Sequence, residues 1–257
     1  MDEKRWNKKG QVTIFIIIAI IIVATGILIY SFYPQIKTTF GGGEKNPKGY
    51  IQTCIEQDIK DAVESISIHG GESNPEFSTI FNEEKIKYLC YTAQYCSPCS
   101  IQEPQLIPRI EAEIKKEIEK NVDSCFTLMK ESYQKRGYDV NLKSGDKKIE
   151  LLPNKIISTF NYSLTLTKGD TQKYDSFVVV LNNNLYELGE IANNIIKWEA
   201  SYGDADVTTY MDYYPNFKVE KNFLGDGTKI YVVSDRVKGN KFQFASKSLV
   251  YSPSGYC

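Results

Sequence analysis

The sequence predicts an α+β protein: an N-terminal hydrophobic transmembrane or filament-core helix, followed by an extracellular domain with amphipathic helices and an antiparallel β-sheet. Three observations support this prediction. An uncharged apolar run near the N-terminus has the length of a membrane span, the chain after it shows helical and then two-residue apolar periods, and all six cysteines follow the run. The expected divisions are a basic leader at 1–10, the hydrophobic helix at 11–38, a Gly/Pro linker at 39–49 and an extracellular α+β domain at 50–257.

Residues 12–32 read VTIFIIIAIIIVATGILIYSF and contain no charged side chain. At about 1.5 Å per residue, a helix of these 21 residues is roughly 31 Å long, the thickness of a bilayer's hydrocarbon core. Because lipid offers the backbone no hydrogen-bond partners, the run must be helical despite its β-branched isoleucines. A buried core helix is excluded because the run is apolar on every face, and a cleaved secretory signal would be apolar over only about 7–15 residues. We therefore expect membrane lipid or identical subunits to contact residues 12–32.

The cysteines predict the orientation of this segment, because the basic residues on its two sides are nearly balanced. No cysteine precedes the apolar run, whereas an even set of six follows it, which is typical of an oxidising exterior. These candidates for disulfide bonds are Cys54, Cys90, Cys96, Cys99, Cys125 and Cys257. We expect a cytoplasmic N-terminus and an extracellular C-terminal domain.

The segment KKGQVTIF, residues 8–15, opens the apolar run. It resembles the class III signal of archaeal pilins and archaellins, and the resemblance extends to about residue 32. This resemblance implies that a dedicated peptidase cuts between Gly10 and Gln11 on the cytoplasmic side, and that the helix stays on the mature protein to pack with its copies in a filament core. Two features differ from pilins. The fifth mature position is Phe15, where bacterial type IV pilins have glutamate, and Gly41-Gly42-Gly43 favours a flexible tether over a continuous rod.

Apolar residues at three- and four-residue steps predict two amphipathic helices at the start of the domain. The first should end at Gly70-Gly71, with His69 as a cation near its C-terminus. The second should span about 108–136 and end at Gly137, with glutamate and lysine side chains on a solvated face. The apolar stripes are Ile51, Ile55, Ile59, Ala62, Val63 and Ile66 in the first helix, and Ile107, Ile110, Ile114, Ile118, Val122, Cys125 and Met129 in the second.

After Gly137 the apolar period changes to two, which predicts strands. The expected elements are strands at 138–142, 149–151, 161–166 and 176–181, a helix at 185–198, and strands at 217–219, 230–233 and 242–245. Turn-forming residues around Gly145, Gly169 and Gly227 predict that the strands on either side of each turn form hairpins. We expect a single antiparallel sheet of six or seven strands with helices on one face.

Cys96-Ser97-Pro98-Cys99 is a motif with potential redox reactivity, because two thiols three positions apart can cycle between dithiol and disulfide. In thioredoxin-like domains the motif follows a core strand and starts a helix. Here we expect no core strand before it, and Pro104 and Pro108 delay the next helix. The sequence therefore favours a structural disulfide cluster, with a membrane-tethered thiol–disulfide exchange protein using Cys96 and Cys99 as the alternative.

The disulfide connectivity stays open, since six cysteines allow fifteen pairings. We expect Cys54 to pair with Cys125, because each lies on or near the stripe of one predicted helix, and the other four cysteines to form two further bonds. A zinc site built from Cys90, Cys96, Cys99 and Cys125 is disfavoured because the chain has no second Cys-x-x-Cys unit. We expect no metal and no cofactor.

Composition and motifs argue against catalysis and nucleic-acid binding. Lys and Arg total 31 and Asp and Glu 32, so the net charge of −1 excludes a strongly basic surface for nucleic acid. The Gly-x-Ser-x-Gly, His-Glu-x-x-His and P-loop motifs are absent, and His69 is the sole histidine of the chain. We therefore expect a protein that is not an enzyme.

Two further features fit an exterior position. Asn161-Tyr162-Ser163 is an acceptor sequence for N-glycosylation within an expected strand, and tyrosines concentrated in 88–95 and 202–214 suit adhesive or subunit contacts. The sequence thus predicts a non-enzymatic cell-surface protein, either membrane-anchored or assembled as a pilin-like filament subunit or other homo-oligomer. Its disulfide-stabilised exterior domain would serve structural or adhesive contacts.

Overall fold

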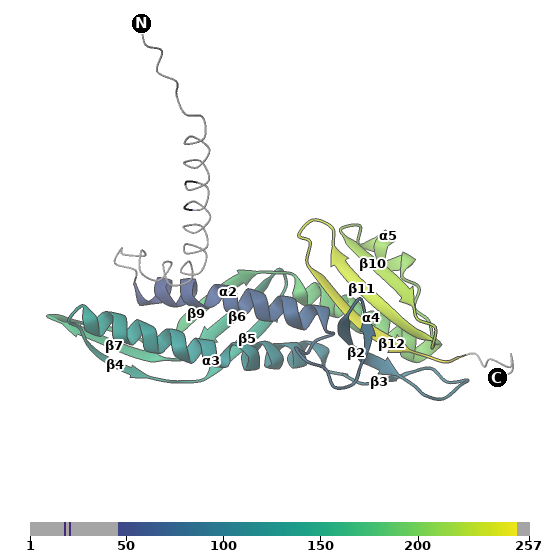
Figure 1. The fold of residues 1–257 in the computed structure, drawn as a ribbon, viewed down its shortest axis with the longest axis horizontal. Coiled ribbons are helices and arrows are strands. Elements are labelled where there is room, and N and C mark those ends of the chain that lie inside the picture. Colours follow the sequence, from purple (N-terminus) through teal and green to yellow (C-terminus); the bar gives the residue numbers. More distant parts are fainter. Residues whose placement is uncertain (1–17, 19–20, 22–45, 251–257) are drawn as a thin grey trace, which may run out of the picture. The chain divides into compact units, whose positions relative to one another are not determined.

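The computed structural model describes residues 18, 21 and 46–250 (Figure 1). The fold of 46–250 is α+β and rich in antiparallel strands, as predicted. None of the helices in the described part of the chain is long and apolar enough to cross a membrane. The predicted leader with Gly10 and Gln11, the predicted helix at 11–38 except residues 18 and 21, and most of the predicted linker lie outside the described residues, as does Cys257.

Helices α2 (Pro47–Ile68) and α3 (Leu106–Lys135) confirm the two predicted amphipathic helices. Helix α2 begins three residues before the expected domain start, because proline is well tolerated in the first turn of a helix. Its predicted end is confirmed: Gly70 and Gly71 have φ values of 81° and 99°, and the Gly71 N–H donates to the Ile66 carbonyl at 2.9 Å. Gly137, at φ 81°, follows the end of α3.

A disulfide joins the two helices. Cys54 of α2 and Cys125 of α3 are bonded, with their Cα atoms 6.1 Å apart. Both cysteines lie where the apolar stripes of the helices face each other, so the pairing expected from the sequence is confirmed.

The two helices cover a small antiparallel sheet with the strand order β5-β6-β9 (Figure 1). Its strands are β5 (Lys147–Leu152), β6 (Lys155–Phe160) and β9 (Phe177–Asn182). Helix α3 packs on β5 and α2 packs on β9. The alternation is clear in β9, where Phe177, Val179 and Leu181 are buried and the residues between them are exposed.

A second three-stranded sheet has the order β4-β7-β8, with β4 (Asp139–Lys143), β7 (Ser163–Lys168) and β8 (Asp170–Tyr174). Two predicted hairpins are therefore wrong. Strand β4 pairs with β7 instead of β5, and β9 pairs with β6 instead of β7. One tight turn lies elsewhere, at Pro153-Asn154, where Asn154 has φ 62°. The turn predicted at Gly169 is present, but it leads from β7 into β8 instead of β9.

The third sheet has the order β1-β2-β12-β11-β10, with the short β3 paired to β2. Its strands are β1 (Ser78–Phe81), β2 (Glu84–Tyr91), β3 (Ser100–Ile101), β10 (Phe217–Phe223), β11 (Thr228–Asp235) and β12 (Lys241–Lys247). The β10–β11 hairpin and the last strand confirm the prediction, whereas the expected single sheet is wrong, since the strands form three sheets. Strand β12 lies antiparallel to β11 but parallel to β2.

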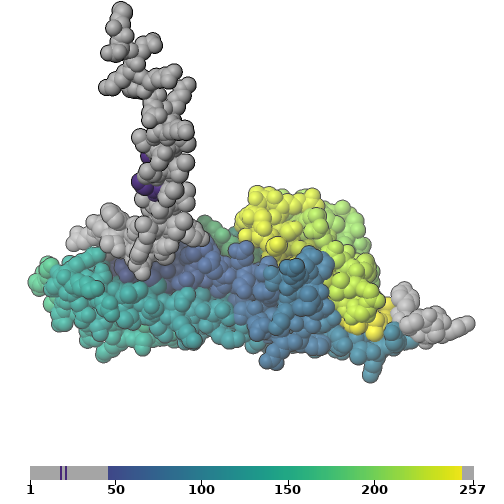
Figure 2. Space-filling model, viewed as in Figure 1, coloured from purple at the N-terminus to yellow at the C-terminus, as the bar shows by residue number. Residues whose placement is uncertain are grey.

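Helix α4 (Leu185–Tyr202), also predicted, packs against β11, β12 and β2 and touches α3. The short α5 (Thr208–Tyr213) lies against β10 (Figure 1). Most buried apolar residues form one cluster that extends from α2 and α3 through α4 into the third sheet, and a second, smaller cluster of Ile86, Tyr88, Ile230 and Ala245 lies within that sheet. In Figure 2 the teal, blue and yellow surfaces of this part of the chain adjoin one another.

A charged cluster fixes the start of α3 to the third sheet. Lys87 Nζ of β2 lies 2.7 Å from Glu72 Oε1 and 3.1 Å from Glu103 Oε2. Arg109 Nη2 of α3 lies 2.6 Å from the same Glu72 oxygen and 3.3 Å from Glu113 Oε1. Glu113 is only 4 % exposed, so the expectation that the whole charged face of α3 is solvated is wrong. These ion pairs give each of the three glutamate carboxylates an opposite charge, which offsets the cost of their partial burial.

Replacing Glu72 with Gln should weaken the dependence of stability on acid. Burial raises the pKa of Glu72, but hydrogen bonds from Lys87 and Arg109 outweigh it and hold the pKa below its usual value. The ionised carboxylate thus stabilises the fold above the unfolded pKa of about 4.3, and this contribution is lost as pH falls through the lower folded pKa. We expect E72Q to lose about 2 kcal/mol at pH 7 in urea unfolding, with the difference from wild type shrinking towards pH 3. As a control, E56Q removes the exposed pair with Lys60 and should lower the free energy of unfolding by less than about 0.5 kcal/mol. An equal loss in E72Q and E56Q would contradict this prediction.

Candidate functional site

The Cys96-Ser97-Pro98-Cys99 motif lies between β2 and β3. Cys99 is bonded to Cys90 of β2, with their Cα atoms 5.3 Å apart, and both are buried. Cys96 is disulfide-bonded as well, so the described residues contain no free cysteine. Because Cys99 pairs with Cys90, the motif does not hold the disulfide between its own two cysteines on which the exchange alternative depends.

The context of the motif differs from the prediction. A core strand, β2, does precede it, although none was expected. The motif is followed by β3, and the next helix starts only at Leu106, as the delaying prolines predicted. Strand β2 was missed because Lys85 and Lys87 interrupt its apolar pattern, and the stem of Lys87 is nevertheless buried while its ammonium group is paired. The motif therefore has no helix N-terminus that would stabilise a reactive thiolate.

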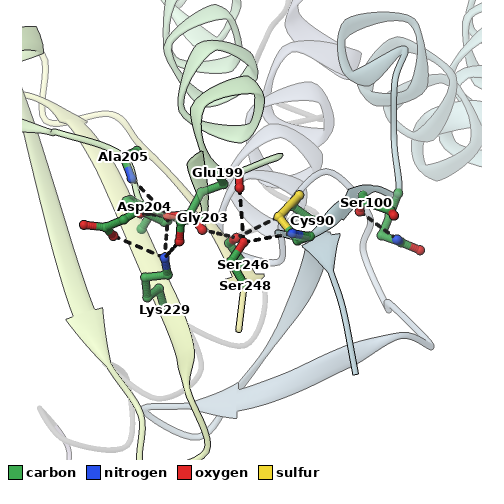
Figure 3. The surroundings of a disulfide bond; sticks show 12 residues. Cys90, Ser100, Glu199, Gly203, Asp204, Ala205, Lys229, Ser246 and Ser248 are labelled. Atoms are coloured by element: carbon green, nitrogen blue, oxygen red, sulfur yellow. Dashed lines mark hydrogen bonds and ion pairs between the residues drawn. A yellow bond between two sulfur atoms is a disulfide. The ribbon is translucent and has the colours of Figure 1, made fainter. Parts of the chain in front are cut away.

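Hydrogen bonds connect this disulfide to helix α4 (Figure 3). The Cys99 N–H donates to Ser248 Oγ at 3.0 Å, and Ser248 Oγ donates to the Glu199 carbonyl oxygen at 3.2 Å. Cys99 Sγ lies 3.6 Å from Ser246 Oγ, which donates to Glu199 Oε2 at 3.0 Å. The disulfide and the last turn of α4 are thereby held to the end of β12.

Glu199 is at the centre of a buried charged group. Its carboxylate is fully buried, and Lys229 Nζ, on β11, lies 2.7 Å from Oε1. The Tyr231 hydroxyl and the Ala205 N–H donate to the same oxygen, and Lys229 also contacts the Gly203 carbonyl at 2.6 Å and Asp204 at 3.2 Å. Burial raises the pKa of Tyr231, and the Glu199 charge raises it further, so the hydroxyl remains a donor. Every charge here has an opposite charge within reach, which offsets the cost of burying it, so removal of one partner would leave the other as an uncompensated buried charge.

The zinc alternative does not fit the structure. All four of its proposed ligands are disulfide-bonded: Cys125 to Cys54, Cys90 to Cys99, and Cys96 as well. Among the described residues, His, Cys, Asp and Glu form no group of three or more that could hold a metal ion. His69, predicted as a cation near the end of α2, has its Nε2 2.8 Å from Glu84 Oε2.

A cavity of about 360 Å³ lies between the end of α2, the end of β9, the start of α4 and the β11–β12 turn. Three lysines, Lys60, Lys238 and Lys241, line it together with Glu64 and apolar side chains. Its one hydroxyl group, on Ser67, donates to the Val63 carbonyl at 2.6 Å. The cavity has the size of a small-molecule site but lacks a nucleophile with an adjacent base. Sequence reasoning missed it because four distant segments meet there.

The tyrosine-rich segments divide into packed and exposed residues. Tyr88 and Tyr91 pack against Phe77, with ring centroids 5.1 Å and 4.8 Å from it. In the second segment Tyr202 is 70 % and Tyr213 77 % exposed. The tyrosines of the second segment therefore offer contact area to solvent, whereas most of the first segment's tyrosine surface is used in packing.

The glycosylation candidate Asn161 lies just before β7, outside the strand in which it was expected, and is exposed.

Comparisons with protein families, with curated proteins and with solved structures found no match to this chain.

Proposed function

We propose that this chain is a non-enzymatic cell-surface protein whose domain after the apolar segment faces the exterior and serves structural or adhesive contacts. The observation that carries the proposal is the oxidation state: every cysteine in the described part of the chain is disulfide-bonded. Disulfides persist in oxidising compartments and are rare in the cytosol. A domain with three cysteine-bearing regions, all oxidised, is suited to the outside of a cell.

The exposed aromatic side chains support contacts as the role of the domain. Trp198 and Tyr202 on α4 lie with ring centroids 5.3 Å apart and are 47 % and 70 % exposed. Aromatic residues are enriched at protein interfaces because they offer a large area with few rotatable bonds. The apolar run at 12–32 would hold the domain to the membrane or to identical subunits.

The orientation is tested by labelling intact cells with a membrane-impermeant amine reagent. Exposed lysines of the domain, such as Lys155 and Lys173, should react in intact cells, because no membrane separates them from the reagent. Mass spectrometry of tryptic peptides reads the labelled positions, and a cytosolic protein serves as the control for leakage. Labelling of these lysines only after lysis would overturn the proposal.

N-terminal sequencing of the native protein separates a filament subunit from a simple anchor. A mature chain that begins at Gln11 supports processing as in pilins, whereas an intact Met1 supports a monomeric anchor. The G10V variant should then accumulate uncleaved, because the added side chain blocks the residue at which the peptidase cuts. Unchanged processing of G10V would rule out this peptidase route, and the conservative G10A variant tests how small the residue must be.

A further inference from the structure

In the acceptor sequence Asn161-Tyr162-Ser163, the two residues that define it are accessible to solvent and the residue between them is buried. Asn161 and Ser163 are exposed, whereas Tyr162 between them is only 2 % exposed. Within the described residues, neither the Asn161 amide group nor the Ser163 hydroxyl makes a side-chain hydrogen bond. Both groups that define the acceptor sequence are therefore free on the surface.

The middle residue anchors this segment. The Tyr162 ring stacks on Phe126 of α3 with centroids 3.8 Å apart, and its hydroxyl donates to Asp123. Lys147 Nζ lies 2.9 Å from Asp123 and neutralises it. Burial, together with the hydrogen bond to Asp123, raises the pKa of Tyr162 to about 12, so the hydroxyl stays protonated and keeps donating. Tyr162 is thus fixed inward, while Asn161 and Ser163 on either side of it are exposed.

The backbone of Asn161 is also supported from behind. Its N–H donates to the Asp146 carbonyl at 2.9 Å, and Lys115 of α3 holds the Asp146 carboxylate at 3.0 Å. Gly145 packs directly against the Asn161 carbonyl, so closely that no side chain fits there. The segment is thus presented in a fixed position while the Asn161 side chain extends to solvent.

We propose that Asn161 carries an N-linked glycan, transferred from a lipid-linked oligosaccharide donor outside the cytosol. In this reaction Asn161 Nδ2 forms a bond to the sugar C1 while the bond from C1 to the donor's phosphate oxygen breaks. The lipid phosphate or pyrophosphate leaves with the bonding electron pair, and the amide proton passes to a base of the transferase. This inference depends on the exterior position of the domain proposed above.

A glycan at Asn161 also restricts how copies of the chain can meet. It would cover the end of the β4-β7-β8 sheet next to β7, so this end must face solvent in any assembly. The exposed aromatics of α4 and the segment after it, on other elements, remain accessible to a partner.

The test uses the full chain purified from membranes of the cells that naturally make it. Trypsin releases residues 156–168, IISTFNYSLTLTK, which contains this acceptor sequence. In wild type the peptide should carry added sugar mass on Asn161, and S163T should keep it because threonine also completes the acceptor sequence. N161Q and S163A should lose it, and since both side chains are exposed and unbonded, circular dichroism should show all variants folded.

The amine-labelling experiment distinguishes the two proposals. Domain lysines labelled in intact cells together with an unmodified 156–168 peptide would overturn the glycan alone. Domain lysines labelled only after lysis, with the peptide unmodified, would overturn both. Sugar mass retained in S163A would also contradict the assignment, since the modification would then not follow the acceptor sequence.

Discussion

Replacing Lys229 with Met should lower the free energy of unfolding by about 3–5 kcal/mol, a large effect for one residue. The change leaves the Glu199 carboxylate fully buried with no cation beside it, next to the charge of Asp204. The Tyr231 hydroxyl and the Ala205 N–H still donate to Glu199, but neutral donors do not offset a buried charge. Urea unfolding of the full chain in a mild detergent, followed by tryptophan fluorescence, measures the loss.

Two further variants make this expectation specific to the charge. E199Q/K229M should be about 2 kcal/mol more stable than K229M alone, because glutamine keeps an acceptor oxygen for Tyr231 and removes the unpaired charge. K218M makes the same substitution in an exposed pair, since Lys218 and Glu220 lie 2.7 Å apart and are each 47 % exposed, and it should cost less than about 1 kcal/mol. If K229M and K218M lost equal stability, Glu199 and Lys229 would not have the structural role assigned to them.

Removing the disulfide between α2 and α3 should cost about 4 kcal/mol, more than removing the one beside β2. Cys54 and Cys125 are 71 residues apart, whereas Cys90 and Cys99 are 9 apart. A longer closed loop restricts the unfolded chain more strongly, so the chain-entropy estimates are about 4 kcal/mol and about 2.5 kcal/mol. C54A/C125A and C90A/C99A compared in the same urea series give both values.

The order of the two double variants is the informative result. Each replaces two partly or fully buried sulfurs with smaller side chains, so the packing losses are similar and the difference reports loop length. A smaller loss for C54A/C125A than for C90A/C99A would mean that the unfolded chain already keeps α2 and α3 together.

The helices were predictable because their pattern is local. Ile51, Ile55 and Ile59 recur at helical spacing, and Gly70 and Gly137 end their helices at positive φ, so no distant contact is needed to recognise α2 and α3. The Cys54–Cys125 bond followed from the same stripes.

Strand partners were not predictable to the same degree, because pairing depends on segments far apart in the chain. Gly145 reads as a hairpin turn, yet the residues around it connect two different sheets. Strand β8 reads DTQKY and is exposed, so it has no apolar alternation that would mark it. Without β8, the sequence predicts that the strand at 161–166 pairs with the strand at 176–181, whereas β7 pairs with β4 and β8.

The same limit applies to the candidate sites. Glu199 stands in the sequence KWEASYGDAD, where a glutamate on a helix reads as a surface residue. Its burial follows from Lys229 and Tyr231 on β11, which a local pattern does not connect to α4. The cavity lined by Lys60 and Lys238 likewise exists only after four segments have come together.

The parallel pairing of β12 with β2 has a consequence for biogenesis. Strand β12, residues Lys241–Lys247, fills the position between β2 and β11 and is synthesised long after β2. Until it arrives, β2 lacks its main neighbour and shows an open edge with buried-type residues such as Ile86 and Leu89. The third sheet therefore cannot be completed from the N-terminus onward during synthesis, because its centre stays vacant until the chain has been made through Lys247.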